Sequence, residues 1–172
     1  MGGIEAAVGA RLRALRLAHG VSLSELARRT GVGKGTLSEL ESGLRNPTLS
    51  TLFRLTTALE LPLSAALDDV EAPVSASGSA VDAWLVERLP ESRTEVYRLR
   101  VRADERQVSE PHAAGVTEQV LVVSGRLLVG PKAVSRSAGH SISYAGDRAH
   151  VWQAADEQDV SALLVMRYPT RL

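Results

Sequence analysis

The segment from Leu23 to Ser42, LSELARRTGVGKGTLSELES, constrains the fold of this chain more than any other segment. Its apolar residues recur at positions where two short crossing helices would touch, and Gly31 lies between the helices, where a positive φ is easiest without a Cβ. The residues at the expected contact are Leu26, Ala27, Val32, Leu37 and Leu40. The sequence therefore predicts two short helices joined by a glycine turn, which approach closely because Ala27 is small.

The second of these helices keeps a polar face once its apolar residues are packed. That face carries Lys34, Thr36, Ser38, Glu39 and Ser42. A helix presented in this way fits the major groove of B-DNA. The segment therefore predicts a DNA-binding protein.

Charge is distributed unevenly along the chain, although its 20 basic and 20 acidic residues leave no net charge. Between Glu5 and Arg54, eight bases stand against four acids, a balance of +4, so the remainder carries −4. A local basic surface attracts phosphates even on a neutral molecule. We therefore expect nucleic acid at the N-terminal part; the alternative is that its arginines only solvate helix faces.

Three absences narrow the class of protein. No apolar run approaches the roughly 20 residues of a membrane span, and the N-terminus lacks the charged segment and long apolar core of a signal peptide. There is no cysteine for a disulfide or a thiolate metal site. The sequence therefore predicts a cytoplasmic protein with no membrane partner.

Helical periodicity extends from about Ile4 to Asp69 and predicts a compact all-α unit of five helices. Ser22 and Glu25 have the spacing of a capping box, which would open the second helix. Thr48 or Ser50 is placed to cap the fourth helix. Residues 1–69 are therefore expected to form the DNA-binding domain.

The fifth helix is expected to follow Pro62 and to end near Leu67. Beyond it, residues 70–81 (VEAPVSASGSAV) are mostly small and polar, with a proline and a glycine, as is typical of a flexible linker. The third segment, residues 82–172, would then be a second domain.

From Val81 the period of the apolar residues changes from helical to two. Alternation between Val96 and Arg102 predicts a strand, and the run Gln119–Val129 predicts a β-hairpin that turns at Ser124-Gly125. Further strands are expected at residues 141–144, 150–153 and 160–168. Six or more short strands predict a sandwich or a small barrel.

Residues 10–69 resemble the Cro/phage-repressor-like helix-turn-helix family, often called the XRE family. The matching stretches are RLRALRLAHGVSLSELARRTGV, GTLSELESG and RNPTLSTLFRLTTAL. The resemblance implies that the helix of residues 33–42 enters the major groove of double-stranded operator DNA. Lys34 would then donate to guanine, Glu39 would accept from cytosine, and the Thr36 methyl group would contact a thymine methyl group.

The same resemblance implies contacts around these base-reading residues. Gly35 would let the start of the helix approach the DNA closely. Phosphate or flanking contacts are expected from Ser38, Ser42, Arg45, Asn46, Arg11 and Arg16. The alternative for Arg11 and Arg16 is a solvated helix face.

Residues 90–168 resemble the cupin family of small β-barrels. The residues at cupin motif positions are His112, Glu118, Gly125, Gly139 and His150. Ala114 stands where the family has a second histidine, and Ala145 stands where it has a proline. The whole chain is thus expected to be an α + β two-domain protein, a five-helix repressor-like bundle followed by an antiparallel β-barrel of the cupin, or jelly-roll, type.

The cupin resemblance implies a small-molecule effector pocket inside the barrel. Its expected lining is His112, Glu118, Tyr144, His150 and Trp152. His112, Glu118 and His150 are also candidate ligands of a divalent metal, Zn or Fe, with coordination positions left open. The alternative is a site that has abandoned its metal, so that the protein carries no cofactor.

Together the resemblances imply a transcription regulator, such as a repressor, that is not an enzyme. Its first domain would bind operator DNA, and its second would sense a small molecule and join two chains in a homodimer. One alternative is a cupin-type non-haem iron oxygenase, similar to the hydroxypropylphosphonate epoxidases, acting through His112, Glu118 and His150. The histidine nearer the glutamate is missing, however, and the basic first domain favours regulation. Another alternative is an antitoxin, which the absence of a disordered toxin-wrapping tail disfavours.

Overall fold

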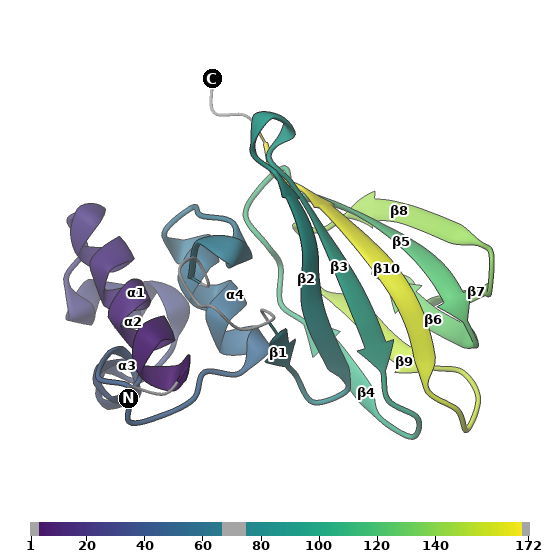
Figure 1. The fold of residues 1–172 in the computed structure, drawn as a ribbon, viewed down its shortest axis with the longest axis horizontal. Coiled ribbons are helices and arrows are strands. Elements are labelled where there is room, and N and C mark those ends of the chain that lie inside the picture. Colours follow the sequence, from purple (N-terminus) through teal and green to yellow (C-terminus); the bar gives the residue numbers. More distant parts are fainter. Residues whose placement is uncertain (1–3, 67–74, 170–172) are drawn as a thin grey trace. The chain divides into compact units, whose positions relative to one another are not determined.

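The structure is a computed structural model that describes residues 4–66 and 75–169 (Figure 1). The chain divides into two compact units, Met1–Val74 and Ser75–Leu172. Within the described residues, no helix is both long enough and apolar enough to cross a membrane.

The first unit is helical, and its helix ends lie where the sequence predicts them. The helices are α1 (Ile4–Ala18), α2 (Leu23–Thr30), α3 (Lys34–Glu41), α4 (Leu49–Ala58) and the 3₁₀ helix η1 (Leu63–Ala66). The Ser22 hydroxyl caps α2 by accepting from the amide of Glu25 at 3.1 Å, and Thr48 caps α4 by accepting from the amide of Thr51 at 3.2 Å. Gly31 ends α2 with a φ of +68°, so the predicted turn between α2 and α3 is confirmed.

The core of this unit forms where the two helices were expected to touch. Leu26, Leu37 and Leu40 are almost fully buried, together with leucines from α1 and α4. Gly9 on α1 lies so close to the end of α3 that a Cβ at this position would clash with the carbonyl oxygen of Leu40. The backbones of α1 and α3 can therefore approach more closely than an alanine would allow.

The expected fifth α-helix is wrong within the described residues. Leu63–Ala66 form a single 3₁₀ turn, and all four side chains are buried. A segment buried on every side has no polar face to present to water, and a tight turn places four residues in the core without a longer helix. The predicted end of this helix near Leu67 lies outside the described residues.

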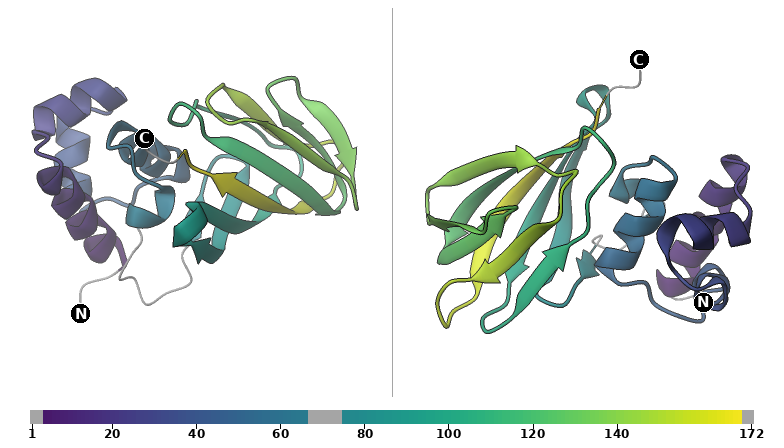
Figure 2. Two further views of the ribbon diagram at one scale, coloured as in Figure 1. Left: turned by 90° about the horizontal axis from the view of Figure 1, so that it is seen from above. Right: turned by 180° about the vertical axis from the view of Figure 1, so that it is seen from behind.

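The second unit is built from antiparallel strands (Figure 2). The strands are β1 (Ser75–Ser77), β2 (Val81–Leu89), β3 (Thr94–Val101), β4 (Arg106–Ser109), β5 (Thr117–Ser124), β6 (Arg126–Gly130), β7 (Val134–Ser137), β8 (Ser141–Ala145), β9 (His150–Ala154) and β10 (Val160–Arg167), with a 3₁₀ turn η2 (Pro90–Ser92) after β2. They form a six-stranded sheet in the order β1-β2-β3-β10-β5-β8 and a four-stranded sheet in the order β4-β9-β6-β7. Apolar side chains such as Val101, Val120 and Leu127 fill the space between the sheets.

Closure of these strands into a barrel is not supported. In the described residues no ladder joins the two sheets, and β8 and β7 are edge strands of their respective sheets. The unit is a two-sheet sandwich of the jelly-roll kind, the architecture found in cupins.

The predicted hairpin at Ser124-Gly125 is also wrong, because the two strands that flank this turn belong to different sheets. β5 pairs with β8 and β10, whereas β6 pairs with β7 and β9, so the chain passes from one sheet to the other at this point. Gly125 has a φ of +82°. A glycine turn marks the change of direction, but the strand that pairs with each arm is decided by the packing of the two sheets.

Part of the predicted linker is paired with the sheet of the second unit. Residues 70–74 lie outside the described residues, but β1 is paired with β2, with Ser75 opposite Trp84 and Ser77 opposite Asp82. The Gln107 side chain accepts hydrogen bonds from the amides of Ala80 and Val81 at 3.2 and 3.3 Å. The small polar residues of this segment therefore form a short edge strand of the second unit, and edge strands are often short and polar.

Candidate functional site

The polar face of α3 is on the surface of the helical unit. Leu37 and Leu40 point inward, each about 1% exposed, and anchor the helix. Five residues of the predicted DNA-reading set are exposed and Thr36 is half-buried; the exposed ones are Lys34, Gly35, Ser38, Glu39 and Ser42. The structure therefore brings the predicted base-reading residues onto one accessible helix.

Arg16 is not part of that surface, and its expected contact with DNA is wrong. Its guanidinium is buried and makes two hydrogen bonds with the Glu41 carboxylate, at 2.7 and 2.8 Å, and a third with the carbonyl of Val21 at 2.9 Å. The hydrogen bond with Glu41 raises the pKa of Arg16. Because Arg16 lies on α1 and Glu41 ends α3, the pair holds the candidate reading helix in place. The sequence spacing carries no sign of this pairing across 25 positions.

The other predicted flanking residues differ in their exposure to solvent. Arg11 is half-buried and its Nε donates to the carbonyl of Ala65 at 2.9 Å. Arg45 and Asn46 are exposed in the loop after α3, and Arg45 Nε lies 3.3 Å from Glu39 Oε2. This exposed ion pair is weak, so Glu39 and Arg45 can part to meet separate DNA groups.

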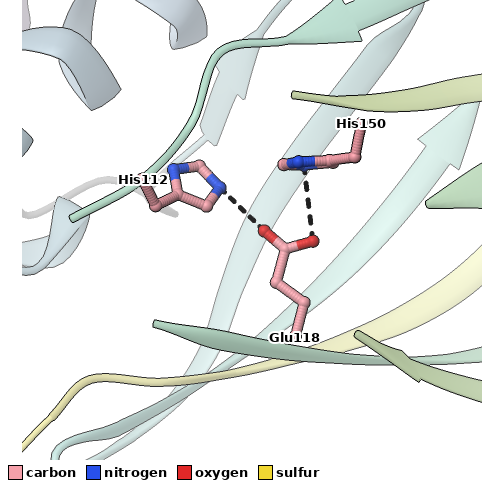
Figure 3. A group of neighbouring side chains, drawn as sticks. All are labelled: His112, Glu118 and His150. Atoms are coloured by element: carbon pink, nitrogen blue, oxygen red, sulfur yellow. Dashed lines mark hydrogen bonds and ion pairs between the residues drawn. The ribbon is translucent and has the colours of Figure 1, made fainter. Parts of the chain in front are cut away.

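The second candidate site lies inside the sandwich, where three side chains from different segments meet (Figure 3). His112 comes from the loop between β4 and β5, Glu118 from β5 in the six-stranded sheet, and His150 from β9 in the four-stranded sheet. His112 Nε2 lies 2.7 Å from Glu118 Oε1, and His150 Nε2 lies 3.4 Å from Glu118 Oε2. All three residues are buried, and their ligand atoms lie within 4.8 Å of one another.

Gly146 shapes the space in which the three side chains meet. Its carbonyl accepts from the amide of His112 at 2.9 Å, and a Cβ at this position would lie 3.2 Å from both the Glu118 and the His112 side chains. A larger residue would therefore push the imidazole and the carboxylate out of place.

The hydrogen bonds of His150 leave one of its nitrogens facing the carboxylate. Nδ1 lies 2.8 Å from the carbonyl oxygen of Arg148, so it must carry the proton that is donated. In a neutral imidazole Nε2 is then an acceptor, and it faces Glu118 Oε2, another acceptor. Within the described residues, neither of these two buried atoms has a hydrogen-bond partner. A second proton on His150 or a cation between the two atoms would resolve the conflict.

Charge at this site is concentrated on Glu118. Burial alone would raise the pKa of Glu118, but the hydrogen bond from His112 and the charge of His150 outweigh burial and lower the pKa. Burial, and then the Glu118 carboxylate, raise the pKa of Tyr144. The site therefore presents an ionised carboxylate beside a neutral phenol.

Aromatic rings complete the surroundings of the three side chains. Tyr144 lies directly opposite Glu118 in the β5–β8 register, and its ring is 5.4 Å from that of His150. The buried Trp152 ring is 6.0 Å from that of His150. The structure thus gathers the five residues predicted to line an effector pocket, three of which are the candidate metal ligands.

These ligands fit a divalent cation. Two imidazole nitrogens and a carboxylate converge on one point, and a backbone carbonyl orients the His150 ring, as is common for metal-bound histidine. Ala114, where cupins have a further histidine, supplies no ligand. A bound ion would have coordination positions left for water or another molecule.

Comparison with known proteins covers both units. Residues 12–65 match the HTH_3 family, described as helix-turn-helix. The chain is 31% identical over 168 residues to the HTH-type transcriptional regulator SutR of Escherichia coli strain K12, covering 92% of this chain and 93% of that protein.

Two solved structures extend the comparison. An HTH_3 family transcriptional regulator from Vibrio cholerae has a TM-score of 0.87 and 25% identity, over 97% of this chain and 98% of that one. Hydroxypropylphosphonic acid epoxidase from S. wedmorenis has a TM-score of 0.47 and 19% identity, over 95% of this chain and 98% of that one. The second likeness is too low to bear on function.

Proposed function

This chain belongs to the XRE helix-turn-helix family of transcriptional regulators, with a C-terminal cupin domain, and we propose that α3 is its reading helix. Lys34 would donate to guanine, Glu39 would accept from cytosine, and Thr36 would contact a thymine methyl group. The observation that carries this assignment is the exposed polar face of α3, which is held from behind by Leu37 and Leu40.

Residues around α3 would bind the DNA backbone and set its register. Arg45 and Asn46 are exposed beside the end of the helix, and Ser38 and Ser42 share its outer face. Arg11, half-buried on α1, would add a further contact with the DNA backbone. Such contacts position a protein on DNA without reading its sequence.

We further propose that the cupin domain is a sensor and that His112, Glu118 and His150 hold a divalent metal, zinc or iron(II). The support is the facing pair of buried acceptors, Glu118 Oε2 and His150 Nε2, which a cation would join. When bound, the ion would offer open coordination positions to a polar effector. Tyr144 and Trp152 would then shape the space beside it.

The alternative, an iron oxygenase, depends on the same three side chains. SutR and the Vibrio cholerae protein, which match over 92% and 97% of this chain, are named transcriptional regulators, and the candidate reading helix still carries base-reading side chains. We therefore propose a regulator without catalytic turnover, acting on chromosomal operator DNA in the cytoplasm.

We also propose that the cupin domain joins two chains. One helix-turn-helix domain reads only a half-site, and two domains on a two-fold axis would place their reading helices ~34 Å apart on a palindromic operator. The support in the structure is that two strands of the six-stranded sheet carry exposed apolar side chains, Val86 and Leu89 on β2 and Leu121 and Val123 on β5.

One experiment tests the regulatory assignment against the enzyme. The full chain, purified without chelator or added metal, is assayed for bound metal and for gel-shift binding to the DNA upstream of its own gene. We expect a specific gel shift. Stoichiometric iron with oxygen consumption and no DNA binding would establish the enzyme instead.

A second experiment tests the metal site by thermal unfolding with and without added Zn²⁺. We expect Zn²⁺ to raise the Tm, because a ligand that binds only the folded state stabilises it, by about 2.7 kcal/mol at a hundredfold excess over Kd. His150→Ala should abolish the rise, whereas His140→Ala, which changes an exposed histidine outside the cluster, should keep it. An equal rise in both variants would place the metal elsewhere.

A further inference from the structure

A hollow of about 270 Å³ opens beside β7 and β8, which are edge strands of the four-stranded and the six-stranded sheet. It is formed by the end of β6, the turn into β7, the edge strand β8, and the loop between β8 and β9. Its volume is slightly below the usual range of small-molecule sites, roughly 300–1,000 Å³. The hollow therefore suits a ligand of few atoms.

The charged groups of this hollow all have one sign. Lys132 and Arg148 line it, no acidic residue does, and neither cation forms an ion pair within the described part of the chain. The second unit, Ser75–Leu172, has 12 acidic and 12 basic residues and so no net charge, and two unpaired cations at one hollow therefore do not follow from a generally basic surface. They produce a local positive potential at its mouth.

Apart from Ser143, the rest of the wall is apolar or aromatic. Val129, Val134 and Ile142 line the hollow together with the ring of Tyr144. A ligand with a short carbon skeleton could rest on these side chains while its charged end meets Lys132 and Arg148.

Two of these residues also reach the buried His-Glu-His cluster. The ring of Tyr144 packs over Gly130, where a Cβ would lie 3.2 Å from the ring, and its hydroxyl is buried beside Glu118. Arg148 lines the hollow, and its carbonyl oxygen accepts the His150 Nδ1 hydrogen bond. A ligand in the hollow would thus touch residues that hold Glu118 and His150.

We propose that this hollow is an anion site, which binds a small molecule bearing a carboxylate or phosphate group. Arg148 supplies a planar guanidinium that can grip two oxygens at once, and Lys132 supplies a second positive charge. The regulatory meaning of this site rests on the proposed sensory role of the cupin domain, but anion binding itself does not.

The test is calorimetric titration of the full chain with malonate and with inorganic phosphate, both at an ionic strength held constant with sodium chloride. The two probes distinguish a carboxylate site from a phosphate site. We expect at least one of them to bind at one site per chain, and Lys132→Gln with Arg148→Gln to weaken that binding about tenfold or more. The control is Arg106→Gln, which removes an exposed arginine on β4 outside the hollow.

The same variants are checked for unchanged Tm without ligand and for an unchanged gel shift, because neither residue belongs to the candidate DNA surface. Failure of both probes to bind wild-type protein, or equal binding by the double variant, would overturn the anion site. If the gel shift is intact in that case, the regulatory assignment still stands. If wild-type protein gives no gel shift, the proposed function is contradicted. The titration would still show whether the hollow binds an anion.

Discussion

At the scale of single residues, the DNA-reading assignment rests on three side chains of α3. Replacing Lys34 or Glu39 by alanine should change base preference at one position of each half-site, by about 1–3 kcal/mol, because a bidentate or charged contact to a base edge is lost. Binding to a library of half-site variants measures this change. If both variants keep the wild-type preference, α3 is not the reading helix.

Arg45 serves as the internal comparison, since it lies beside Glu39 but is expected to contact only phosphate. Arg45→Ala should weaken binding to all sequences alike and reduce the salt dependence, because one fewer counterion is released. A change in base preference with Arg45→Ala would mean that the ion pair with Glu39 directs the glutamate instead.

The buried pair of Arg16 and Glu41 should matter for folding of the helical unit. Arg16→Ala leaves the Glu41 carboxylate without its partner and should lower the free energy of unfolding by about 3 kcal/mol, the cost of breaking a buried ion pair. Arg13→Ala removes an exposed arginine from the same helix and should have little effect. Urea denaturation compares the two, and equal losses would argue against a structural role for Arg16.

At the scale of elements, the packing of α1 on α3 leads to opposite expectations for two helical glycines. Gly9→Ala should destabilise the unit by about 1–3 kcal/mol, because the added Cβ would clash with the carbonyl of Leu40. Gly35 on α3 has no atom within 4 Å of the same added group. Gly35→Ala should therefore stabilise the helix, by up to about 1 kcal/mol.

The Gly9→Ala and Gly35→Ala variants also distinguish an effect on stability from an effect on DNA binding. Thermal unfolding gives the stability of each variant, and a gel shift gives its DNA affinity. If the start of α3 approaches the DNA closely, Gly35→Ala should bind DNA more weakly although it unfolds at a higher temperature. Unchanged affinity would remove Gly35 from the DNA surface.

At the scale of the whole molecule, the main expectation is a homodimer formed through the cupin domain. Replacing Leu121 and Val123 together by glutamate should turn a dimer into a monomer in light scattering at micromolar concentration, because two like charges would face their copies across a two-fold axis. Val108→Glu is the control, since Val108 is 54% exposed, like Val123, but lies on β4 in the other sheet. A monomeric wild-type chain would contradict the dimer.

Local features of this protein followed from its sequence, because their causes lie within a few residues of one another. Ser22 and Thr48 cap helices through amides three residues away, and Gly31 ends α2 where a positive φ is needed. Residues at cupin motif positions, such as His112, Glu118 and His150, also met as expected, because the resemblance carries the strand order of a whole family.

Other features were decided only by tertiary structure, because their causes lie far apart in the chain. The sequence predicts a surface position for Arg16, but in the folded unit α3 places Glu41 against its guanidinium. The sequence around Gly125 looks like a hairpin, but the two strands that flank the turn, β5 and β6, pair with other strands in different sheets. Lys132 and Arg148 had no motif to mark them, since only the meeting of the β7 and β8 edges places them at one hollow. A local pattern sets the conformation of a segment, whereas its partner depends on the free energy of the assembled core.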